Sequence, residues 1–455
     1  MSSPHFHSGA SLALYNLLLP TGLLVALPGF LVKMKKRGGY GPGFGQRFGN
    51  YADDFPPAAT DRSQRPLWIH AVSVGEVLIA QKLIVEILRR EPELPVVLST
   101  TTSTGYAIAV KNLPSGVQVF YNPLDLPPIV RRVLDRIRPR AIVLIEAEVW
   151  PNLVHQTSRE GIPVFLVNAR LSPRSEKRYL QFQRWVAPIF RMLDHVCVQE
   201  PEDVARWCGL GVDPDRITHT GSIKFDQSAG PDAASSATAA QVIAFREILE
   251  QLWGNDRPKT VLLASSHDGE ETAVGKCILT LRLKFPDLKF LVAPRHFERA
   301  DAVERALKEL GLRPCRRSQL SAPLPAGMSP PDTLIIDTTG ELRAWQALPD
   351  LVVIGKSFLA TGGQNPVEAI SSGTAVITGP HMENFSALMA QLLKRKGIIQ
   401  VRDIDDLSAA IARLLGDPAL MQTTTSNARE ALSRHSGATE KTAERILAHP
   451  HTAEK

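Results

Sequence analysis

The sequence is poor in the residues that build metal centres and disulfide frameworks. It has 4 cysteines in 455 residues. Cys197, Cys208, Cys277 and Cys315 are scattered and form no CxxC pair. A zinc site or a disulfide framework is therefore not expected, and a reducing compartment suits the chain.

Several motifs that would assign a function class are also missing. No GxGxxG follows the first predicted strand with a ribose-binding acid downstream, which argues against an NAD-linked oxidoreductase. No recognition motif with base-stacking aromatic residues is present, so nucleic acid is not an expected partner. No Asp-x-Asp motif stands at any of the candidate sites described below, so we expect no essential bound metal and no other cofactor.

Neither sign of charge dominates the composition. Lys and Arg number 52 and Asp and Glu 46, which leaves a formal net charge of +6. The 44% hydrophobic and 22% charged residues are typical of a globular protein and not of a disordered one. The mild basic excess fits an anionic partner, such as a phosphorylated lipid or an anionic membrane surface.

One long uncharged segment lies near the N-terminus. It runs from Gly9 to Val32 and is followed at once by Lys33, Lys35, Lys36 and Arg37. As a helix it would reach roughly 36 Å, and a bilayer core needs about 30 Å. A cleaved signal peptide would place the basic residues before the apolar run. We therefore expect residues 1–37 to be a membrane-anchor helix, which spans the membrane or, given Pro20 and Pro28, lies kinked in its interface. The positive-inside rule then places the rest of the chain in the cytoplasm.

The remaining sequence predicts two α/β domains. Short, continuous apolar runs alternate with helical stretches, which is typical of parallel sheets covered by helices on both faces. The predicted strands of the first half are 67–74, 96–100, 117–121, 141–146, 163–167 and 195–199. Those of the second half are 260–264, 289–293, 333–337, 351–355, 374–378 and 398–402. We predict domains at 38–227 and 242–455, joined by a linker over 228–241 that is rich in Gly, Pro, Ser and Ala. Two such Rossmann-like, doubly wound domains would face each other across a cleft, with ligands beyond the carboxyl ends of the strands.

Three motifs of the first half carry acid–base or charged groups. In WIHAVSVGE, Glu76 stands in the first turn of a helix directly after a strand, where the helix dipole favours its ionised form. Such a carboxylate can act as a general base, although a merely favourable first-turn residue explains it equally well. In IEAEVWPN, Glu146 and Glu148 end a buried strand; they can bind substrate hydroxyls or simply solvate the strand end. In TGSIKFD, Lys224 can neutralise a departing phosphate or be an ordinary surface lysine.

Three loops of the second half suit a nucleotide. APRH contains Pro294 and Arg295, and DTTGEL contains Gly340, Glu341 and Leu342. GGQNPVEA is a Gly-rich loop that runs into a helix through Asn365, Pro366, Val367 and Glu368. Backbone N–H groups at a helix start bind phosphate, and a carboxylate binds a ribose diol. SSHDGEE (265–271) echoes the opening of the first domain, and we assign it no chemistry.

Taken together, these strings resemble the bacterial 3-deoxy-D-manno-octulosonic acid (Kdo) transferases. The resemblance runs from KKRGGYGPGFGQRFG to about residue 400. It includes HAVSVGE, TTTSTG, EAEVWPN, NARLSPRS, TGSIKFD, SSHDGEE, APRH, GEL, GGQNPVEA and GPHMENF in the family's order. Two positions depart from the usual pattern: Lys356 replaces a glycine, and Ala147 replaces a threonine found in many members.

The resemblance implies an inverting glycosyltransferase of the GT-B fold. Its donor would be CMP-Kdo and its acceptor a lipid A precursor (lipid IVA), at the cytoplasmic face of the inner membrane. The family's proton-acceptor position falls on Glu76, and its two transition-state-stabilising positions fall on Glu146 and Lys224. Its CMP-binding positions fall on residues 294–295, 340–342 and 365–368. The domain 38–227 would bind the acceptor, and 242–455 would bind the donor. From their place after the strand 163–167, Arg170 and Arg174 are candidate contacts to acceptor phosphates, or they belong to a solvated helix face.

Other functions remain open from the sequence. The nearest alternatives are another GT-B glycosyltransferase and a UDP-sugar epimerase, although epimerases lack the N-terminal segment and this motif order. A different class is a non-catalytic, membrane-bound protein that binds lipid or sugar nucleotide. The joint presence of Glu76, Glu146 and Lys224 argues against that alternative.

Overall fold

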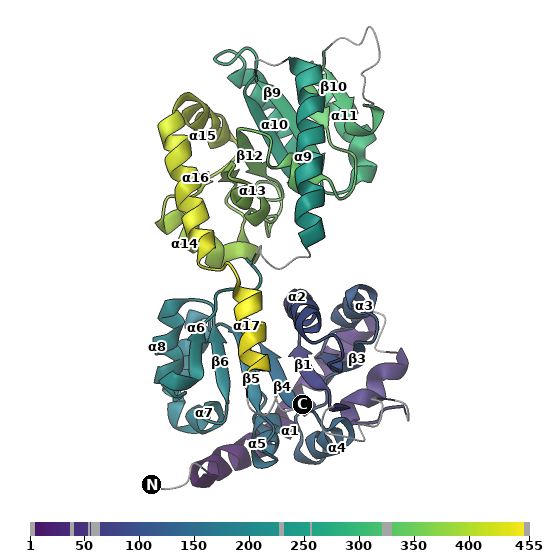
Figure 1. Ribbon diagram of the computed structural model, residues 1–455, viewed down its shortest axis with the longest axis vertical. Helices are drawn as coiled ribbons and strands as arrows, with labels where there is room; N and C mark the ends of the chain where they lie inside the picture. Colours follow the sequence, from purple (N-terminus) through teal and green to yellow (C-terminus); the bar gives the residue numbers. More distant parts are fainter. Residues whose placement is uncertain are drawn as a thin grey trace. The chain divides into compact units, whose positions relative to one another are not determined.

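The computed structural model describes residues 5–36, 41–52, 55, 64–226, 232–254, 257–320 and 330–449. Only the backbone is described for residues 5–8, 23, 26–28, 30–36, 41–42 and 232–238. The chain forms two compact units (Figure 1). Unit 1 consists of Met1–Ala229 and His435–Lys455, and unit 2 of Gly230–Arg434.

Unit 1 contains a seven-stranded parallel sheet in the order β3-β2-β1-β4-β5-β6-β7. Its strands are β1 (Leu67–Ala71), β2 (Val96–Thr100), β3 (Gln118–Tyr121), β4 (Ala141–Ile145), β5 (Val164–Ala169), β6 (His195–Val198) and β7 (Ile217–His219). Its helices are α1 (His5–Lys36), α2 (Val74–Arg90), α3 (Ser103–Asn112), α4 (Pro127–Ile137), α5 (Pro151–Arg159), α6 (Pro173–Gln181), α7 (Gln183–Phe190), α8 (Pro201–Gly209) and α17 (Ala438–Leu447), with 3-10 turns η1 (Gly41–Phe48) and η3 (Pro214–Arg216).

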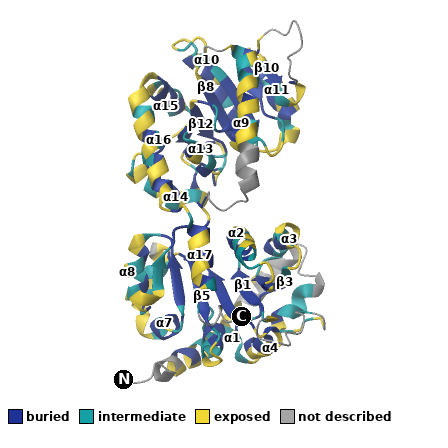
Figure 2. Ribbon diagram, in the orientation of Figure 1, coloured by how far each residue is buried: buried dark blue, intermediate teal, exposed yellow. Residues whose placement is uncertain are grey.

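The central strands are buried because their residues are apolar on both faces of the sheet (Figure 2). In β4, Ile142 and Leu144 join a core that includes residues of α4, α5, α7 and α8. Their neighbours Val143 and Ile145 point the other way, into a core shared with α2, α3 and α17. The alternation of strand side chains thus packs helices on both faces, as predicted.

Unit 2 repeats this architecture with a seven-stranded parallel sheet in the order β10-β11-β9-β8-β12-β13-β14. Its strands are β8 (Thr260–Ser266), β9 (Lys289–Pro294), β10 (Pro314–Arg316), β11 (Thr333–Ile335), β12 (Leu351–Ile354), β13 (Ala375–Thr378) and β14 (Ile399–Gln400). Its helices are α9 (Asp232–Trp253), α10 (Glu270–Leu281), α11 (Ala300–Glu309), α12 (Leu342–Trp345), α13 (Val367–Ser372), α14 (Ser386–Lys394), α15 (Asp405–Gly416) and α16 (Pro418–Ser433), with 3-10 turns η4 (Phe297–Arg299), η5 (Arg317–Gln319) and η6 (Glu383–Phe385). The prediction of two parallel α/β domains is therefore confirmed.

The predicted domain boundaries need two corrections. Most of the expected linker, residues 228–241, is helical, since α9 begins at Asp232; only 228–231 lie outside the described residues. Alanine is the strongest helix former, and the Ala-rich segment continues directly into an amphipathic stretch. The second correction concerns residues 435–455, which were assigned to the second domain. They belong to unit 1, where α17 packs against α2 (Figure 1).

The N-terminal segment forms one helix, α1, that continues through Pro20 and Pro28. Its first half packs on unit 1: Leu12 is buried in the core, and the amides of Asn16 and Asn152 exchange hydrogen bonds of 3.1 and 2.7 Å. In the described part of the chain, no helix has both the length and the apolar character needed to cross a membrane. Of the basic cluster, Arg37 lies outside the described residues.

Candidate active site

The strand order of each sheet marks one position where ligands are expected. The order reverses between the neighbouring strands β1 and β4 in unit 1, and between β8 and β12 in unit 2. In open parallel sheets, ligands bind beyond the carboxyl ends of the strands at such a reversal. Glu76 follows β1 and Glu146 follows β4. Two predicted catalytic residues therefore lie at the topological switch point of unit 1.

Backbone strain gathers at the same edges of the two sheets. Four residues other than glycine have a left-handed backbone at the carboxyl end of a strand: Glu146 (φ 61°), Asn168 (φ 52°), Ser265 (φ 55°) and Lys356 (φ 56°). Asn168 and Ser265 are the penultimate residues of β5 and β8, Glu146 directly follows β4, and Lys356 is the second residue after β12. Such conformations cost of order 1–3 kcal/mol each and concentrate at functional sites. These loop shapes are therefore held by their surroundings and not by local preference.

Glu76 is a buried carboxylate at the start of α2. Ser73 is the N-cap residue, and its hydroxyl accepts a hydrogen bond from the Glu76 N–H (3.4 Å). The Glu76 carboxylate in turn accepts from the Val72 N–H and the Ser73 hydroxyl, both at 2.8 Å. Only 8% of the residue is exposed. The structure thus fixes this side chain through its own helix start, as in a capping box.

Burial raises the pKa of Glu76 above its ordinary value, and the nearby charge of Glu146 adds to the rise. The hydrogen bonds from Val72 and Ser73 oppose the rise without cancelling it. Desolvation therefore has a larger effect on this pKa than the hydrogen bonds that favour the ionised form. A carboxylate with a raised pKa is a stronger base, which suits it for proton abstraction near neutral pH.

Glu76, Glu146, Glu148 and Lys224 form one group of interacting charges. Burial, followed by the charges of Glu76 and Glu146, raises the pKa of Glu148 to about 7. Burial lowers the pKa of Lys224, while the Glu146 carboxylate favours its charged form and Arg170 disfavours it. The structure therefore brings all three predicted catalytic residues together and adds Glu148.

The two arginines predicted to bind the acceptor differ in their surroundings. Arg170 follows β5, is exposed, and lies near enough to Lys224 to influence its pKa. Arg174 lies exposed in the first turn of α6. Arg170 is thus part of the charged group around Lys224, and Arg174 is placed on the adjoining helix.

The predicted donor residues of unit 2 follow neighbouring strands. Pro294 ends β9. The Arg295 N–H donates to the carbonyl of Ser266 on β8 (3.0 Å), and Arg295 is exposed. Gly340, Glu341 and Leu342 follow β11 at the start of α12. The Glu341 carboxylate accepts from the Thr338 hydroxyl (2.6 Å) and the Trp345 indole (3.1 Å) and pairs with Arg317 (3.3 Å). It therefore stabilises its own loop.

The Gly-rich loop also forms as predicted, but the helix after it is short. Asn365 accepts from the Val367 N–H (3.1 Å), Pro366 is the N-cap residue, and α13 ends at Ser372. Glu368 is half-buried in the first turn. In the described part of the chain, no three His, Cys, Asp or Glu side chains are grouped as metal ligands; that transfer needs no metal stays a prediction.

The sequence reading missed the role of Glu270, in the SSHDGEE string. This carboxylate is fully buried and accepts hydrogen bonds from four backbone N–H groups. The donors are His267 (2.9 Å), Lys356 (2.7 Å), Ser357 (3.1 Å) and Phe358 (3.2 Å). It therefore ties the loop after β12 to the start of α10 and holds Lys356 in its left-handed conformation. One indication of this role was present in the sequence, because the DGE string at 268–270 is similar to the VGE string at 74–76 that contains Glu76.

The two matching glutamates differ in how many of their lone pairs are used. A carboxylate offers about four lone-pair positions. All are taken in Glu270, whereas the Glu76 carboxylate accepts the two hydrogen bonds described above. Glu76 thus retains capacity to accept a proton, and Glu270 is a structural anchor. This difference distinguishes the two carboxylates, which otherwise occupy similar positions at the start of a helix.

Comparison with known proteins places the chain in a family. A family model described as 3-deoxy-D-manno-octulosonic-acid transferase (kdotransferase) matches residues 42–227. A 3-deoxy-D-manno-octulosonic acid transferase of Haemophilus influenzae is 30% identical over 423 residues, which are 93% of this chain and 94% of the relative. The chain belongs to the Kdo transferase family. A second Kdo transferase, from Bordetella pertussis, is 34% identical over 83% of this chain and 86% of its own length. The protein is accordingly a glycosyltransferase.

A solved structure supports the fold of this Kdo transferase family member. MurG of Acinetobacter baumannii aligns with a TM-score of 0.50 at 12% identity and covers 84% of this chain and 99% of its own. At this identity the likeness concerns the fold alone. It agrees with the two parallel α/β units described above.

Proposed function

We propose that this glycosyltransferase moves a Kdo residue from CMP-Kdo to a lipid A precursor, lipid IVA, in lipopolysaccharide core biosynthesis. The observation that carries the proposal is Glu76: a buried, hydrogen-bonded carboxylate with raised pKa and remaining acceptor capacity, at the switch point of unit 1. Membership of the Kdo transferase family identifies Kdo as the transferred sugar. The named donor and acceptor follow from the resemblance of the motifs.

Glu76 acts as the general base in this mechanism. Its carboxylate takes the proton of an acceptor hydroxyl while the hydroxyl oxygen forms a bond to the anomeric carbon of Kdo. The bond from that carbon to the phosphate oxygen of CMP breaks on the opposite side, and CMP leaves with the bonding electrons. One displacement at the anomeric carbon inverts its configuration.

Lys224 and Glu146 provide the electrostatic part of the mechanism. The Lys224 ammonium neutralises negative charge that develops on the leaving phosphate. Glu146 favours the charged form of Lys224, which burial alone would disfavour. Arg170, beside Lys224, and Arg174 bind phosphate groups of the acceptor. In this mechanism Glu76 accepts the proton, and Glu146 keeps Lys224 in its charged form.

Unit 2 binds the donor in this proposal. Arg295 is suited to the phosphate because its guanidinium is exposed at the carboxyl edge of the sheet. Residues 340–342 and 365–368 contact the rest of the nucleotide, and Glu368 is suited to the ribose diol. Lys356 adds a cation at the switch point of the same sheet, in a loop that Glu270 holds in place.

The protein works at the cytoplasmic face of the inner membrane in this proposal. Exposed apolar side chains of α1 support attachment to the membrane, because Leu17, Leu18, Leu24 and Val25 expose 58–79% of their surface. The basic cluster from Lys33 to Arg37, which follows the uncharged segment in the sequence, is of a composition that favours anionic membrane surfaces. The acceptor is itself a membrane lipid, so attachment brings the enzyme to its substrate.

The test is incubation of the full-length protein with CMP-Kdo and lipid IVA, with product mass as the readout. Addition of one or more Kdo masses to the lipid is expected. Reactions with UDP-N-acetylglucosamine in place of CMP-Kdo, and without acceptor, serve as controls. A lipid of unchanged mass with CMP-Kdo, or a product formed from the UDP-sugar, would overturn the proposal.

A further inference from the structure

The loop that carries Lys224, Thr220–Asp226, is held from several sides. The Asn168 amide oxygen accepts a hydrogen bond from the Ile223 N–H (2.9 Å). The Lys82 ammonium, on α2, donates to the carbonyls of Ile223 (3.1 Å) and Asp226 (3.0 Å). The Ser222 N–H donates to Nδ1 of His435 (3.1 Å). The residues on both sides of Lys224 are thus fixed through their backbones.

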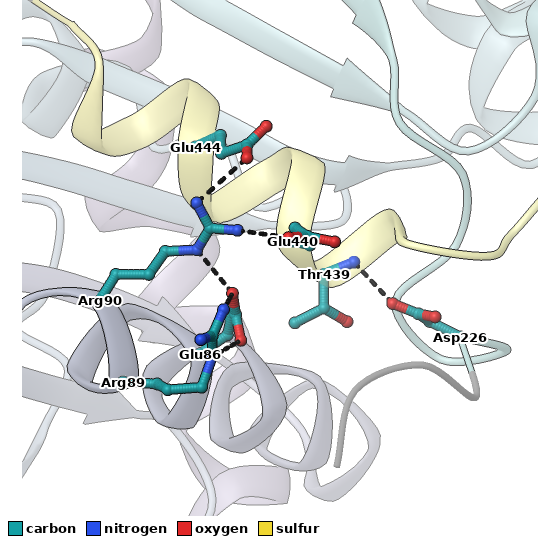
Figure 3. A network of polar contacts seen from close by, with 7 residues as sticks. All are labelled: Glu86, Arg89, Arg90, Asp226, Thr439, Glu440 and Glu444. Carbon is teal, nitrogen blue, oxygen red and sulfur yellow. Dashed lines mark hydrogen bonds and ion pairs between the residues drawn. The ribbon is translucent and has the colours of Figure 1, made fainter. Parts of the chain in front are cut away.

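Asp226 joins this loop to the C-terminal helix (Figure 3). Its carboxylate is 1% exposed and accepts from the N–H groups of Gly437 (3.1 Å) and Thr439 (2.7 Å). The N-cap residue of α17 is Gly437, which has no side chain to cap the helix. Asp226 therefore supplies the cap from a position 211 residues earlier in the chain.

The same helix is attached to α2, whose first turn carries Glu76. Arg90, in the last turn of α2, pairs with Glu440 (2.8 Å) and Glu444 (3.1 Å) of α17, as well as with Glu86 (2.6 Å) (Figure 3). The buried side chains of Ala438, Ala443 and Ile446 share a core with those of α2. Helix α17 thus contacts both the loop of Lys224 and the helix of Glu76.

We propose that Asp226 is a positioning residue for the transferase reaction, acting through α17 and the 220–226 loop to hold the Lys224 ammonium in register with Glu76 and Glu146. This inference rests on the proposed function of Lys224. The stabilisation that an ammonium gives a developing phosphate charge depends on a preorganised distance. A displacement of about 1 Å is enough to lower a rate by about 10²-fold.

The test is a double-mutant cycle on the full-length protein with CMP-Kdo and lipid IVA. Asp226→Ala should lower kcat by about 10- to 100-fold with little change in the KM for CMP-Kdo. In a Lys224→Ala background, the same substitution should lower kcat by less than about twofold, because residues that act as a unit are not additive. A residue that only stabilises the fold would lower kcat by the same factor in both backgrounds, and that result would overturn the inference.

Two further variants serve as controls for folding. Asp226→Asn keeps one carbonyl acceptor and should recover part of the kcat lost in Asp226→Ala; it also allows the cycle to be completed if the alanine variant does not fold. Glu440→Gln disturbs the exposed face of the same helix and should leave kcat within about twofold of wild type. An equal loss of kcat in Glu440→Gln would count against a specific role of Asp226.

The double-mutant cycle also distinguishes failure of this inference from failure of the proposed function. Absence of Kdo transfer by the wild-type protein would overturn the proposed function itself. Transfer by the wild type with full activity in Lys224→Ala would remove the catalytic role of Lys224 and the positioning role with it. Additive losses in an otherwise Lys224-dependent enzyme would overturn the positioning role alone.

Discussion

The same substitution at the two matching glutamates is expected to destabilise the protein strongly at Glu270 and little at Glu76. In Glu270→Gln, one carboxylate oxygen becomes an amide N–H₂ that faces backbone donors. Two of the four N–H groups that now bond to Glu270 then lose their acceptor. Hydrogen bonds to a buried charged group contribute about 1.5–3 kcal/mol each, so the loss is about 3–6 kcal/mol. For a domain of this size, at about 2–4 °C per kcal/mol, that corresponds to a fall in Tm of about 6–24 °C.

In Glu76→Gln the remaining carbonyl oxygen still accepts from the Val72 N–H, and the Ser73 hydroxyl can rotate to accept from the amide. The folded state raises the pKa of Glu76. Its contribution to stability is therefore present below the unfolded pKa and is lost as pH rises through the folded pKa. A neutral glutamine avoids that loss at neutral pH, so the unfolding free energy should stay within about 1 kcal/mol of wild type.

Thermal unfolding and amide hydrogen exchange of both full-length variants check this contrast. In Glu270→Gln, the amides of Lys356, Ser357 and Phe358 should exchange on the order of 10² times faster or more, while unit 1 keeps the wild-type pattern. An unchanged Tm and unchanged exchange in Glu270→Gln would refute its role as an anchor. A loss of several kcal/mol in Glu76→Gln would show that Glu76 is the structural residue instead.

Two other predictions concern Glu148 and Lys356. Because burial and two neighbouring carboxylates raise the pKa of Glu148 to about 7, its protonated form stabilises the fold at low pH, and that stabilisation is lost as pH rises from about 4.5 to 7. The Tm of Glu148→Gln should therefore fall less than that of wild type between pH 5 and pH 8, and an equal fall in both would contradict the shift. Lys356 has a φ of 56°, so Lys356→Gly should be more stable than Lys356→Ala by about 1 kcal/mol in thermal unfolding; equal stabilities would argue against strain at this position.

The strands that the sequence predicted lie in continuous, largely apolar runs, including the short strands β11 and β14 within the runs 333–337 and 398–402. Buried parallel strands are apolar on both faces, so β1, β2, β4 and β8 could be recognised from composition alone. The edge strands β7, with the sequence ITH, and β10, with the sequence PCR, were missed because three residues that include polar or charged side chains give no such signal. In the structure β7 pairs with the preceding strand β6, and β10 pairs with the following strand β11.

The sequence predicted only those site residues that stand in a recognisable motif after a strand. Glu76, Glu146 and Lys224 follow strands of one sheet, and the motif order drew attention to each. The anchors of the Lys224 loop could not be predicted, since Asn168, Lys82 and Asp226 make their contacts across 55–213 residues of sequence. The return of α17 to unit 1 was equally hidden, because an amphipathic helix does not indicate which core its apolar face will join.

The most direct test of the central claim is a single-turnover comparison of wild type and Glu76→Gln with saturating CMP-Kdo and lipid IVA. The glutamine variant should bind CMP-Kdo with an unchanged Kd, while transfer of Kdo to the lipid slows by about 10²- to 10⁴-fold, the usual contribution of a general base. Transfer by Glu76→Gln at a rate within tenfold of wild type, with donor binding intact, would contradict the assignment of Glu76 as the base.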